Sequence, residues 1–156
     1  MRIAEDNPTA IAALEELIRD SKDETARWNA VSSLGKIAED NPTAIAALVE
    51  LIRDSKNEST RSQVVYNLGK IAEDNPTAIA ALVELIRDCQ SEDIRRQAAS
   101  VLGKILTKSD KMTAVVTALK NDLSDEVYKV IWHCTQTMTY PAFYQAWHSD
   151  SFPLQN

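Results

Sequence analysis

The sequence predicts an all-α protein, a right-handed α-solenoid of about four two-helix repeats with a C-terminal capping segment. Three observations predict this class. A segment of 34 residues occurs three times almost unchanged, apolar residues recur with the 3.6-residue period of an α-helix, and only 3 Gly and 5 Pro occur among 156 residues. One hairpin of two amphipathic helices cannot bury both apolar faces, so neighbouring hairpins are expected to stack.

The repeat begins at Ala4 and returns at Ala38 and Ala72. Residues 1–106 are assigned to these three copies, with residues 1–6 as the remnant of a preceding repeat, and residues 107–156 to a degenerate fourth repeat and an aromatic-rich cap. The fourth copy is expected to keep the 34-residue spacing. On that spacing, Asp125, Glu126 and Lys129 correspond to Asp23, Glu24 and Arg27.

The first helix of each repeat, helix A, is predicted to start after an Asn-Pro pair. In the first copy, Asn7 can cap the exposed backbone N–H groups, and Pro8 suits the first helical position because no donor is needed there. The helix then runs to about Asp20. Its apolar face is predicted to comprise Ile11, Leu14, Leu17 and Ile18.

The turn to the second helix, helix B, matches the pattern of a capping box. Ser21 is followed three residues later by Glu24, and the second repeat keeps the pair as Ser55 and Glu58. In the third repeat a cysteine replaces this serine, so Ser91 is the alternative cap.

Helix B is predicted to turn Ala30, Val31, Leu34 and Ile37 inward. A glycine lies inside this helix in each intact copy, although Gly costs about 1 kcal/mol relative to Ala there. We expect the missing side chain to permit a close approach of the neighbouring helix. The three glycines are Gly35, Gly69 and Gly103.

Composition excludes several functional classes. The net charge of −6 and pI near 4.9 disfavour a nucleic-acid partner, and no basic stripe offsets this charge. No apolar run approaches the roughly 20 residues of a transmembrane helix, so no membrane association is predicted. Two cysteines far apart fit a reducing compartment, and the expected location is the cytoplasm.

Differences between the copies gather on helix B. They form one stripe, because the positions are three or four residues apart on the helix. Two hypotheses fit this stripe: a surface diversified for binding a partner, with Trp28, Tyr66 and Arg96 as its main contacts, or free drift of solvent-facing positions. The candidate partner-binding residues are Trp28, Asn29, Ser32, Ser62, Gln63, Tyr66, Arg96, Gln97 and Ser100.

The C-terminal segment concentrates histidine, cysteine and aromatic residues. Val127, Ile131, Cys134 and Met138 share one helical face, which predicts that Cys134 points inward, and Pro141 can start a short closing helix. The expected structure is an aromatic mini-core that covers the end of the stack. Its members would be Trp132, Tyr140, Phe143, Tyr144 and Trp147.

Cys134 and His148 allow two chemical alternatives to this structural role: a nucleophile–base pair, or two ligands of a metal ion. A structural zinc site needs four ligands, and only His133 and Asp150 lie nearby in the sequence. His133 also points away from the side that Cys134 occupies. No catalytic residue, cofactor or metal site is therefore predicted, and Cys134 and His148 are retained as a candidate motif without an assigned role.

The repeats resemble HEAT repeats, especially the short form found in phycobilisome lyase-like proteins. The residues that carry the resemblance are the Arg-Asp-Ser-Lys-Asp-Glu turn, Arg27, and the Leu-Gly-Lys-Ile ending at residues 34–37. A tetratricopeptide array has the same period, but its pattern requires an aromatic residue at the positions of Ala38 and Ala72. The resemblance implies a ladder of ion pairs along the stack. Its members would be Asp20, Asp54, Asp88, Arg27, Arg61 and Arg95.

The C-terminal segment resembles the Cys- and His-containing segment that follows HEAT-like repeats in bacterial, mainly cyanobacterial, NACHT-type NTPases. The residues that carry this resemblance are Trp132, Cys134, Gln136, Tyr140, Pro141, Phe143, Tyr144, Trp147 and His148. It implies the C-terminal part of a larger signalling or defence protein. This chain has no phosphate-binding Gly-x-x-x-x-Gly-Lys loop of its own.

The expected function is a non-catalytic protein–protein interaction or scaffold module. Its partner would be another protein or another domain of the parent chain, and end-to-end self-association through an uncapped N-terminal face is a further expectation. The alternative function, implied by the lyase-like resemblance, is a subunit of an enzyme that attaches phycobilin chromophores.

Overall fold

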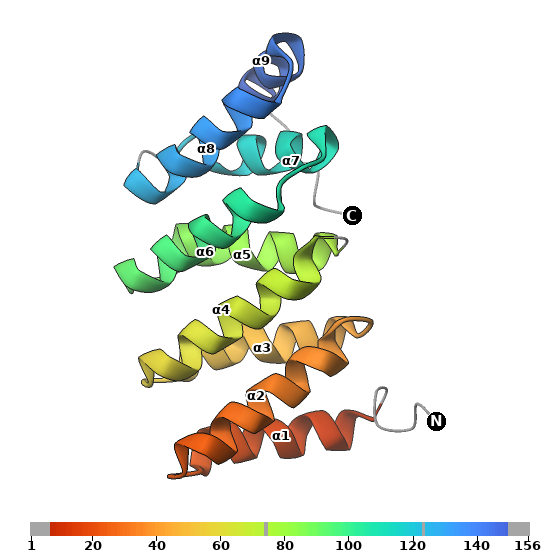
Figure 1. Cartoon of the computed structure of the whole chain (residues 1–156), viewed down its shortest axis with the longest axis vertical. Coiled ribbons are helices and arrows are strands. Elements are labelled where there is room, and N and C mark those ends of the chain that lie inside the picture. The colour runs from red at the N-terminus through yellow and green to blue at the C-terminus, as the bar shows by residue number, and fades with distance from the viewer. Residues whose placement is uncertain (1–6, 74, 123, 150–156) are drawn as a thin grey trace. The chain divides into compact units, whose positions relative to one another are not determined.

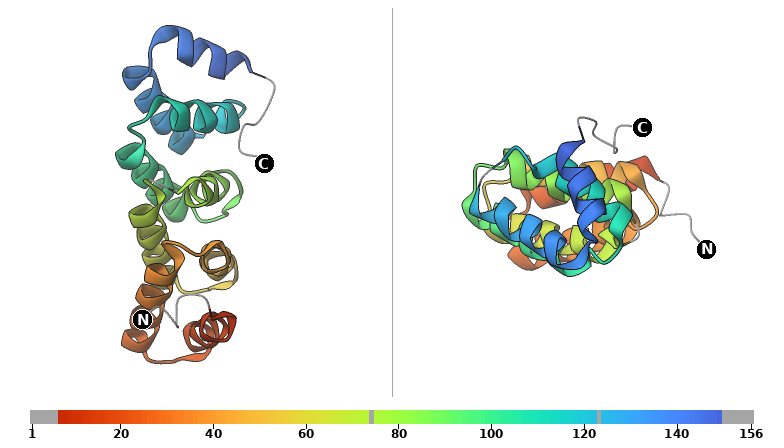
Figure 2. Two further views of the ribbon diagram at one scale, coloured as in Figure 1. Left: turned by 90° about the vertical axis from the view of Figure 1, so that its right-hand side faces the viewer. Right: turned by 90° about the horizontal axis from the view of Figure 1, so that it is seen from above.

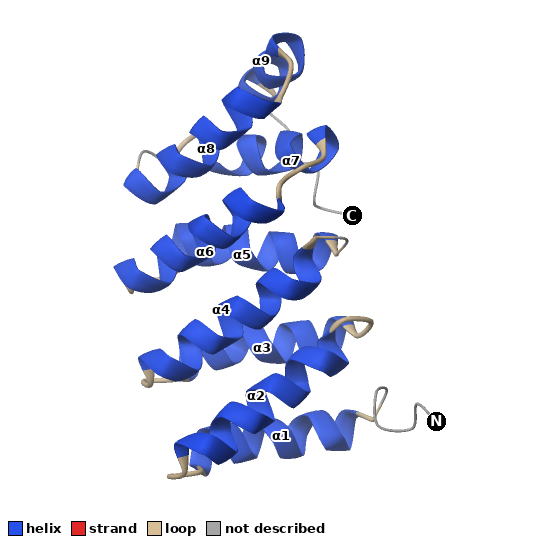
Figure 3. Cartoon of the chain, in the orientation of Figure 1, coloured by secondary structure: helices blue, strands red, loops and turns tan. Residues whose placement is uncertain are grey.

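The computed structural model describes residues 7–73, 75–122 and 124–149, with the side chain of Ser109 excepted. Within these ranges every regular element is an α-helix (Figure 3). The helices are α1 (Pro8–Asp20), α2 (Glu24–Ala38), α3 (Pro42–Asp54), α4 (Glu58–Ala72), α5 (Pro76–Asp88), α6 (Glu92–Ile105), α7 (Ser109–Leu119), α8 (Asp125–Thr137) and α9 (Tyr140–His148). The predicted remnant at residues 1–6 lies outside the described residues.

The chain divides into two compact units, Met1–Ile71 and Ala72–Asn156. In the first unit, α1 packs against both α2 and α3, so consecutive hairpins contact each other (Figure 1). The side view in Figure 2 shows α1 and α3 in one layer and α2 and α4 in a second.

The second unit repeats this arrangement from α5 onward. The α5–α6 hairpin packs on the next hairpin through the pairs α5 with α7 and α6 with α8, and α9 lies mainly against α7 (Figure 1). The predicted class, an all-α solenoid of helical hairpin repeats, is confirmed.

The starts of helix A follow the sequence prediction. Asn7 is the N-cap of α1, and its Oδ1 accepts a hydrogen bond from the Thr9 N–H at 3.0 Å. Asn41 and Asn75 cap α3 and α5 in the same way, and each is followed by Pro at the first helical position. An Asn-Pro pair therefore satisfies the first orphan donors of each of these helices.

The predicted capping box at the start of helix B is wrong. The N-cap of α2 is Asp23, which accepts from the Thr25 N–H at 3.0 Å, so Glu24 is the first helical residue. Ser21 instead ends α1, and its hydroxyl oxygen accepts from the Asp23 N–H at 3.2 Å. Asn57 caps α4 by accepting from the Thr60 N–H at 3.0 Å. Ser91 caps α6, as the alternative proposed.

The core lies between the two layers of each unit. On α2, Ala30, Val31 and Leu34 are buried as predicted, and Ile37 is half-buried. On α1, Ile11 and Ile18 of the predicted apolar face are buried, whereas Leu17 of the same face is 44% exposed. Its counterparts in the next two repeats, Leu51 and Leu85, are buried. Leu51 lies on α3, which contacts the preceding α1.

Gly35 permits the close approach that the sequence predicts. A Cβ atom added to Gly35 would lie 2.8 Å from Cγ and 3.0 Å from Cβ of Asn67, which belongs to α4. Asn67 is buried, and its amide nitrogen donates to the Gln63 carbonyl at 3.1 Å. At Gly103 the prediction is wrong, because nothing lies within 4 Å of the added Cβ.

The arginines that occupy the same position in the three repeats do not form the predicted ladder of ion pairs with aspartates. Arg27 donates to the Ser21 carbonyl at 2.5 Å, and Arg95 donates to the Cys89 carbonyl at 2.8 Å. Both carbonyls belong to the residue that ends helix A, where orphan acceptors and the negative helix end attract a cation. Arg61 pairs with Glu58 at 3.8 Å, and Asp54 pairs with Arg19 of α1 at 3.3 Å.

The fourth repeat does not keep the predicted 34-residue spacing, since the N-caps Lys108 and Ser124 follow Asn75 and Ser91 at 33 residues. Buried positions of α8 follow those of α6 at a spacing of 32, not 34. The pairs are Ile94 with Glu126, Ala98 with Val130, Leu102 with Cys134, and Leu106 with Met138. Glu126 therefore takes the place of an apolar residue, and its carboxylate is 4.0 Å from Arg95 Nε.

The two glycines give a matched stability test. Gly103→Ala should raise the free energy of unfolding by up to about 1 kcal/mol, because Ala favours the helix and meets open space. Gly35→Ala should lower it by about 1 kcal/mol, because the new methyl group displaces the buried Asn67. Urea denaturation followed by circular dichroism measures both. Equal changes in the two variants would contradict the close packing at Gly35.

Candidate partner-binding surface

The first part of the candidate surface lies on α2. Trp28 is 55% exposed and Asn29 is also exposed, while Ser32, one turn further along, is half-buried. The buried residues Ala30, Val31 and Leu34 hold the opposite face of this helix against the core. The described fold therefore leaves more than half of the Trp28 side chain in water, so much of its apolar surface is available for burial against a partner.

The matching positions on α4 lie beside those of α2. The Gln63 side chain donates from Nε2 to the Trp28 carbonyl at 2.9 Å, which joins the two helices at the stripe. Tyr66 is 59% exposed, and Lys70 Nζ lies 4.6 Å from the centre of its ring. Ser62 and Gln63 are half-buried. The first unit thus brings the six candidate residues of α2 and α4 onto adjoining helices.

The third set, in the second unit, is more polar. Arg96 is exposed, but its guanidinium donates to Glu92 at 2.6 Å and to Asp93 at 3.1 Å on its own helix. Gln97 is half-buried and Ser100 is exposed. Arg96 is therefore held by two carboxylates, which reduces the charge that it can present to a partner.

The structure adds two residues that the sequence reasoning missed, Tyr128 and Trp132 on α8. At the observed spacing of 32 they correspond to Arg96 and Ser100, and α8 packs beside α6. More than half of each side chain is exposed, and their rings stack with centroids 6.2 Å apart. The 34-residue alignment concealed them, because it placed Trp132 outside the stripe.

The predicted aromatic mini-core is wrong for most of its members. Trp132, Tyr140, Tyr144 and Trp147 are exposed, and only Phe143 is half-buried. The buried residue of α9 is Ala146, which suits the close contact of this short helix with α7. The outer side of α9 instead carries a row of rings, with Tyr140 and Tyr144 centroids 6.0 Å apart.

Cys134 and His148 have separate surroundings. Cys134 is fully buried on α8, and burial raises the pKa of its thiol from 9.0 to about 12, so the thiol stays protonated at neutral pH. His148 is exposed on α9, with its ring 4.2 Å from that of Tyr144. His133 Nε2 lies 3.0 Å from the Leu106 carbonyl. The described part of the chain shows no hydrogen bond between Cys134 and His148.

Across residues 7–73, 75–122 and 124–149, no group of three or more His, Cys, Asp or Glu side chains is placed to hold a metal ion. Among the described helices, none has the length and apolar character needed to span a bilayer.

These features define a helical-hairpin repeat protein with exposed aromatic residues on helix B. Models of the HEAT-repeat family match residues 3–69 and 52–132, and the chain belongs to this family. A second family model, described as NACHT C-terminal cysteine and histidine-containing, matches residues 120–148. The chain is thus a HEAT-repeat array with a segment similar to the C-terminal segment of NACHT proteins. No curated protein and no solved structure matches it significantly.

The burial of Cys134 predicts slow alkylation. In a Cys89→Ser variant, iodoacetamide at pH 7.5 should modify Cys134 only after urea unfolds the chain, because the native thiol is both shielded and protonated. The reciprocal variant, Cys134→Ser, leaves the half-buried Cys89 as the control. Mass spectrometry over time measures both. Rapid modification of Cys134 in the native protein would contradict a core role.

Proposed function

We propose that this chain is a non-catalytic protein-interaction scaffold in a NACHT-type signalling or defence NTPase. The match at residues 120–148 supports the association with NACHT proteins, and the HEAT match supports a repeat scaffold. The observation that carries the binding role is the exposure of aromatic residues along helix B. Trp28 and Tyr66 represent it in the first unit, and Tyr128 and Trp132 in the second.

The binding hypothesis explains these residues better than surface drift does. Trp and Tyr contribute more to interface energies than other residues, because a large rigid ring buries much apolar area at little entropic cost. In the first unit the neighbours of Trp28 supply polar groups, including the Gln63 amide that joins α2 to α4. A ring surrounded by such groups has the composition of an interface with an apolar centre and a polar rim.

The partner is proposed to be another protein or another domain of the parent chain. The acidic total charge, −6, continues to disfavour nucleic acid. Free Cys89 and Cys134 support a cytoplasmic location for the complex, since a reducing compartment keeps thiols unpaired.

The test is capture of partners with matched variants. Trp28→Ala with Tyr66→Ala should remove at least nine-tenths of the captured partner, because each truncation of a central aromatic costs about 2 kcal/mol or more. Its melting temperature should stay within about 2 °C of the parent, because both side chains are exposed. Tyr140→Ala removes an even more exposed ring from α9 and serves as the control.

Quantitative mass spectrometry of proteins retained by each variant gives the measurement. Retention of the same partners by the double variant as by Tyr140→Ala would show that the α2–α4 stripe is not the binding surface. A fall in melting temperature of 8 °C or more would instead assign Trp28 and Tyr66 to packing.

A further inference from the structure

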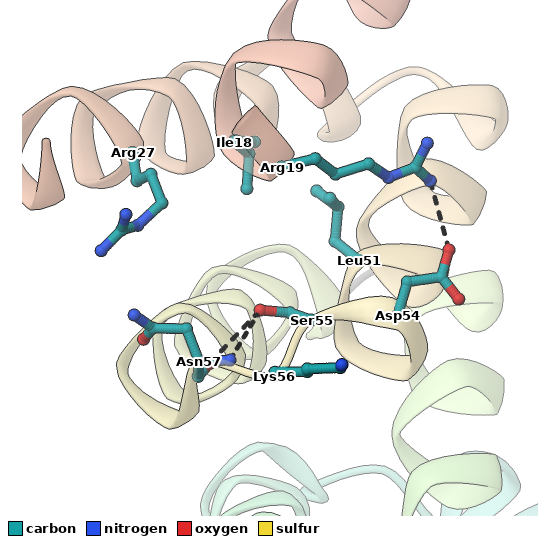
Figure 4. Close-up of a pocket in the computed structure, with 8 residues that line it drawn as sticks. All are labelled: Ile18, Arg19, Arg27, Leu51, Asp54, Ser55, Lys56 and Asn57. Atoms are coloured by element: carbon teal, nitrogen blue, oxygen red, sulfur yellow. Dashed lines mark hydrogen bonds and ion pairs between the residues drawn. The ribbon is translucent and has the colours of Figure 1, made fainter. Parts of the chain in front are cut away.

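A cavity of about 550 Å³ lies between the first two hairpins, near the turns that join helix A to helix B (Figure 4). This volume falls within the range of small-ligand sites. Its lining comes from α1, the start of α2, the end of α3 and the turn before α4. The lining residues are Ile18, Arg19, Arg27, Leu51, Asp54, Ser55, Lys56 and Asn57.

The lining is cationic although the chain is acidic. Three cationic side chains, those of Arg19, Arg27 and Lys56, surround the cavity, with Asp54 as the one carboxylate. The lining therefore has a formal charge of +2 in a chain whose net charge is −6. A cleft lined by one sign of charge concentrates ligands of the opposite sign.

These cations differ in how far they are already neutralised. Arg19 pairs with Asp54 at 3.3 Å, so this pair contributes no net charge. Arg27 is half-buried and donates only to the neutral Ser21 carbonyl, and its Nε has no hydrogen-bond partner in the described structure. Lys56 is exposed, its ammonium group points away from Arg27 (Figure 4), and it forms no ion pair within the described residues. Two cations thus lack a counter-charge.

The turn that carries Lys56 supplies further donors. Ser55 and Asn57 form a tight turn, in which the Asn57 N–H donates to Ser55 Oγ at 3.1 Å. Asn57 Oδ1 is occupied by the Thr60 N–H, which leaves the amide nitrogen of Asn57 as a donor at the cavity. The positive end of α4 begins here too, and helix N-termini favour anions.

We propose that this cavity binds a phosphomonoester. Such a group carries a charge of about −1.5 to −2 at pH 7, which matches the two cations that lack a counter-charge. Arg27 would supply the planar guanidinium, and the exposed Lys56 side chain would turn from its position in Figure 4 to supply the ammonium group. The buried Ile18 and Leu51 also line the cavity and make part of its wall apolar. The phosphate belongs either to a phosphorylated side chain of a peptide or to a small phosphorylated metabolite.

The chain contains its own matched control. Lys22 occupies in the first turn the place that Lys56 occupies in the second, and it is exposed but does not line the cavity. Lys56→Gln and Lys22→Gln therefore remove the same charge from equivalent turns. Both variants should fold normally, which unchanged melting temperatures verify.

The measurement is a titration with sodium phosphate, followed through the backbone amide NMR signals of residues 55–57, with sodium chloride at equal ionic strength as the reference. Phosphate should cause saturable shifts. Lys56→Gln should weaken its binding about five-fold or more, because a charge-assisted hydrogen bond is lost, whereas Lys22→Gln should leave it unchanged. Shifts that chloride reproduces, or equal affinities in the two variants, would overturn the proposal.

Two further probes distinguish the sources of the phosphate. A phosphoserine peptide that binds at residues 55–57 more tightly than inorganic phosphate, while its unphosphorylated form does not bind, identifies a partner protein. Adenosine monophosphate that does so, while adenosine does not, identifies a metabolite. The cavity titration is independent of the Trp28–Tyr66 test, so failure of either result leaves the other interpretable.

Discussion

Neighbouring hairpins share their apolar faces, and the rest of each unit depends on this burial. A hairpin such as α1–α2 encloses residues between its own helices, but the outer apolar side of each helix A remains exposed until another hairpin covers it. Leu17 and Leu51 show the difference at the same repeat position: the first is 44% exposed and the second 1%. Packing between hairpins also limits which residues fit at a given position. At Gly35 a side chain would collide with Asn67 of α4, whereas at Gly103 a side chain would meet open space.

Outside this shared core, polar side chains satisfy the backbone groups at the helix ends. Asn residues cap the starts of helix A, and Arg27 and Arg95 bind the carbonyls at its end. The arrangement brings several cations to the turns between the helices. One consequence is the cationic cavity beside Arg27 and Lys56, and another is that helix B carries its variable side chains away from these contacts.

The sequence was sufficient to predict the helices, the period and the Asn-Pro starts, because each depends on residues within one or two turns. It also predicted the inward position of Cys134 from helical spacing. The prediction of a capping box failed because Asp23 and Ser21 are both suitable N-cap residues in the same turn. Asp23 is the N-cap in the structure, since it directly precedes the first helical residue. Local patterns that allow two caps do not decide between them.

Features that depend on neighbouring repeats were harder to predict. The 34-residue period did not predict the shorter spacing of the fourth repeat, and Trp132 lies exposed on α8 rather than in the expected mini-core. The predicted Arg–Asp ladder depends on distances between side chains that are set only when the hairpins pack. In the structure, Arg27 donates to the Ser21 carbonyl instead. The cavity could not have been found from the repeat pattern, because Lys22 and Lys56 are equivalent in sequence and differ only in what surrounds them.

The most direct measurement of shared burial compares Leu51→Ala with Leu17→Ala by urea denaturation. The two leucines have the same position in nearly identical helices, so helix propensity and the chemistry of the change are matched. Loss of the buried Leu51 side chain should lower the free energy of unfolding by about 2–5 kcal/mol, and loss of Leu17 by under about 1 kcal/mol. Equal losses would show that the hairpins do not depend on each other for burial.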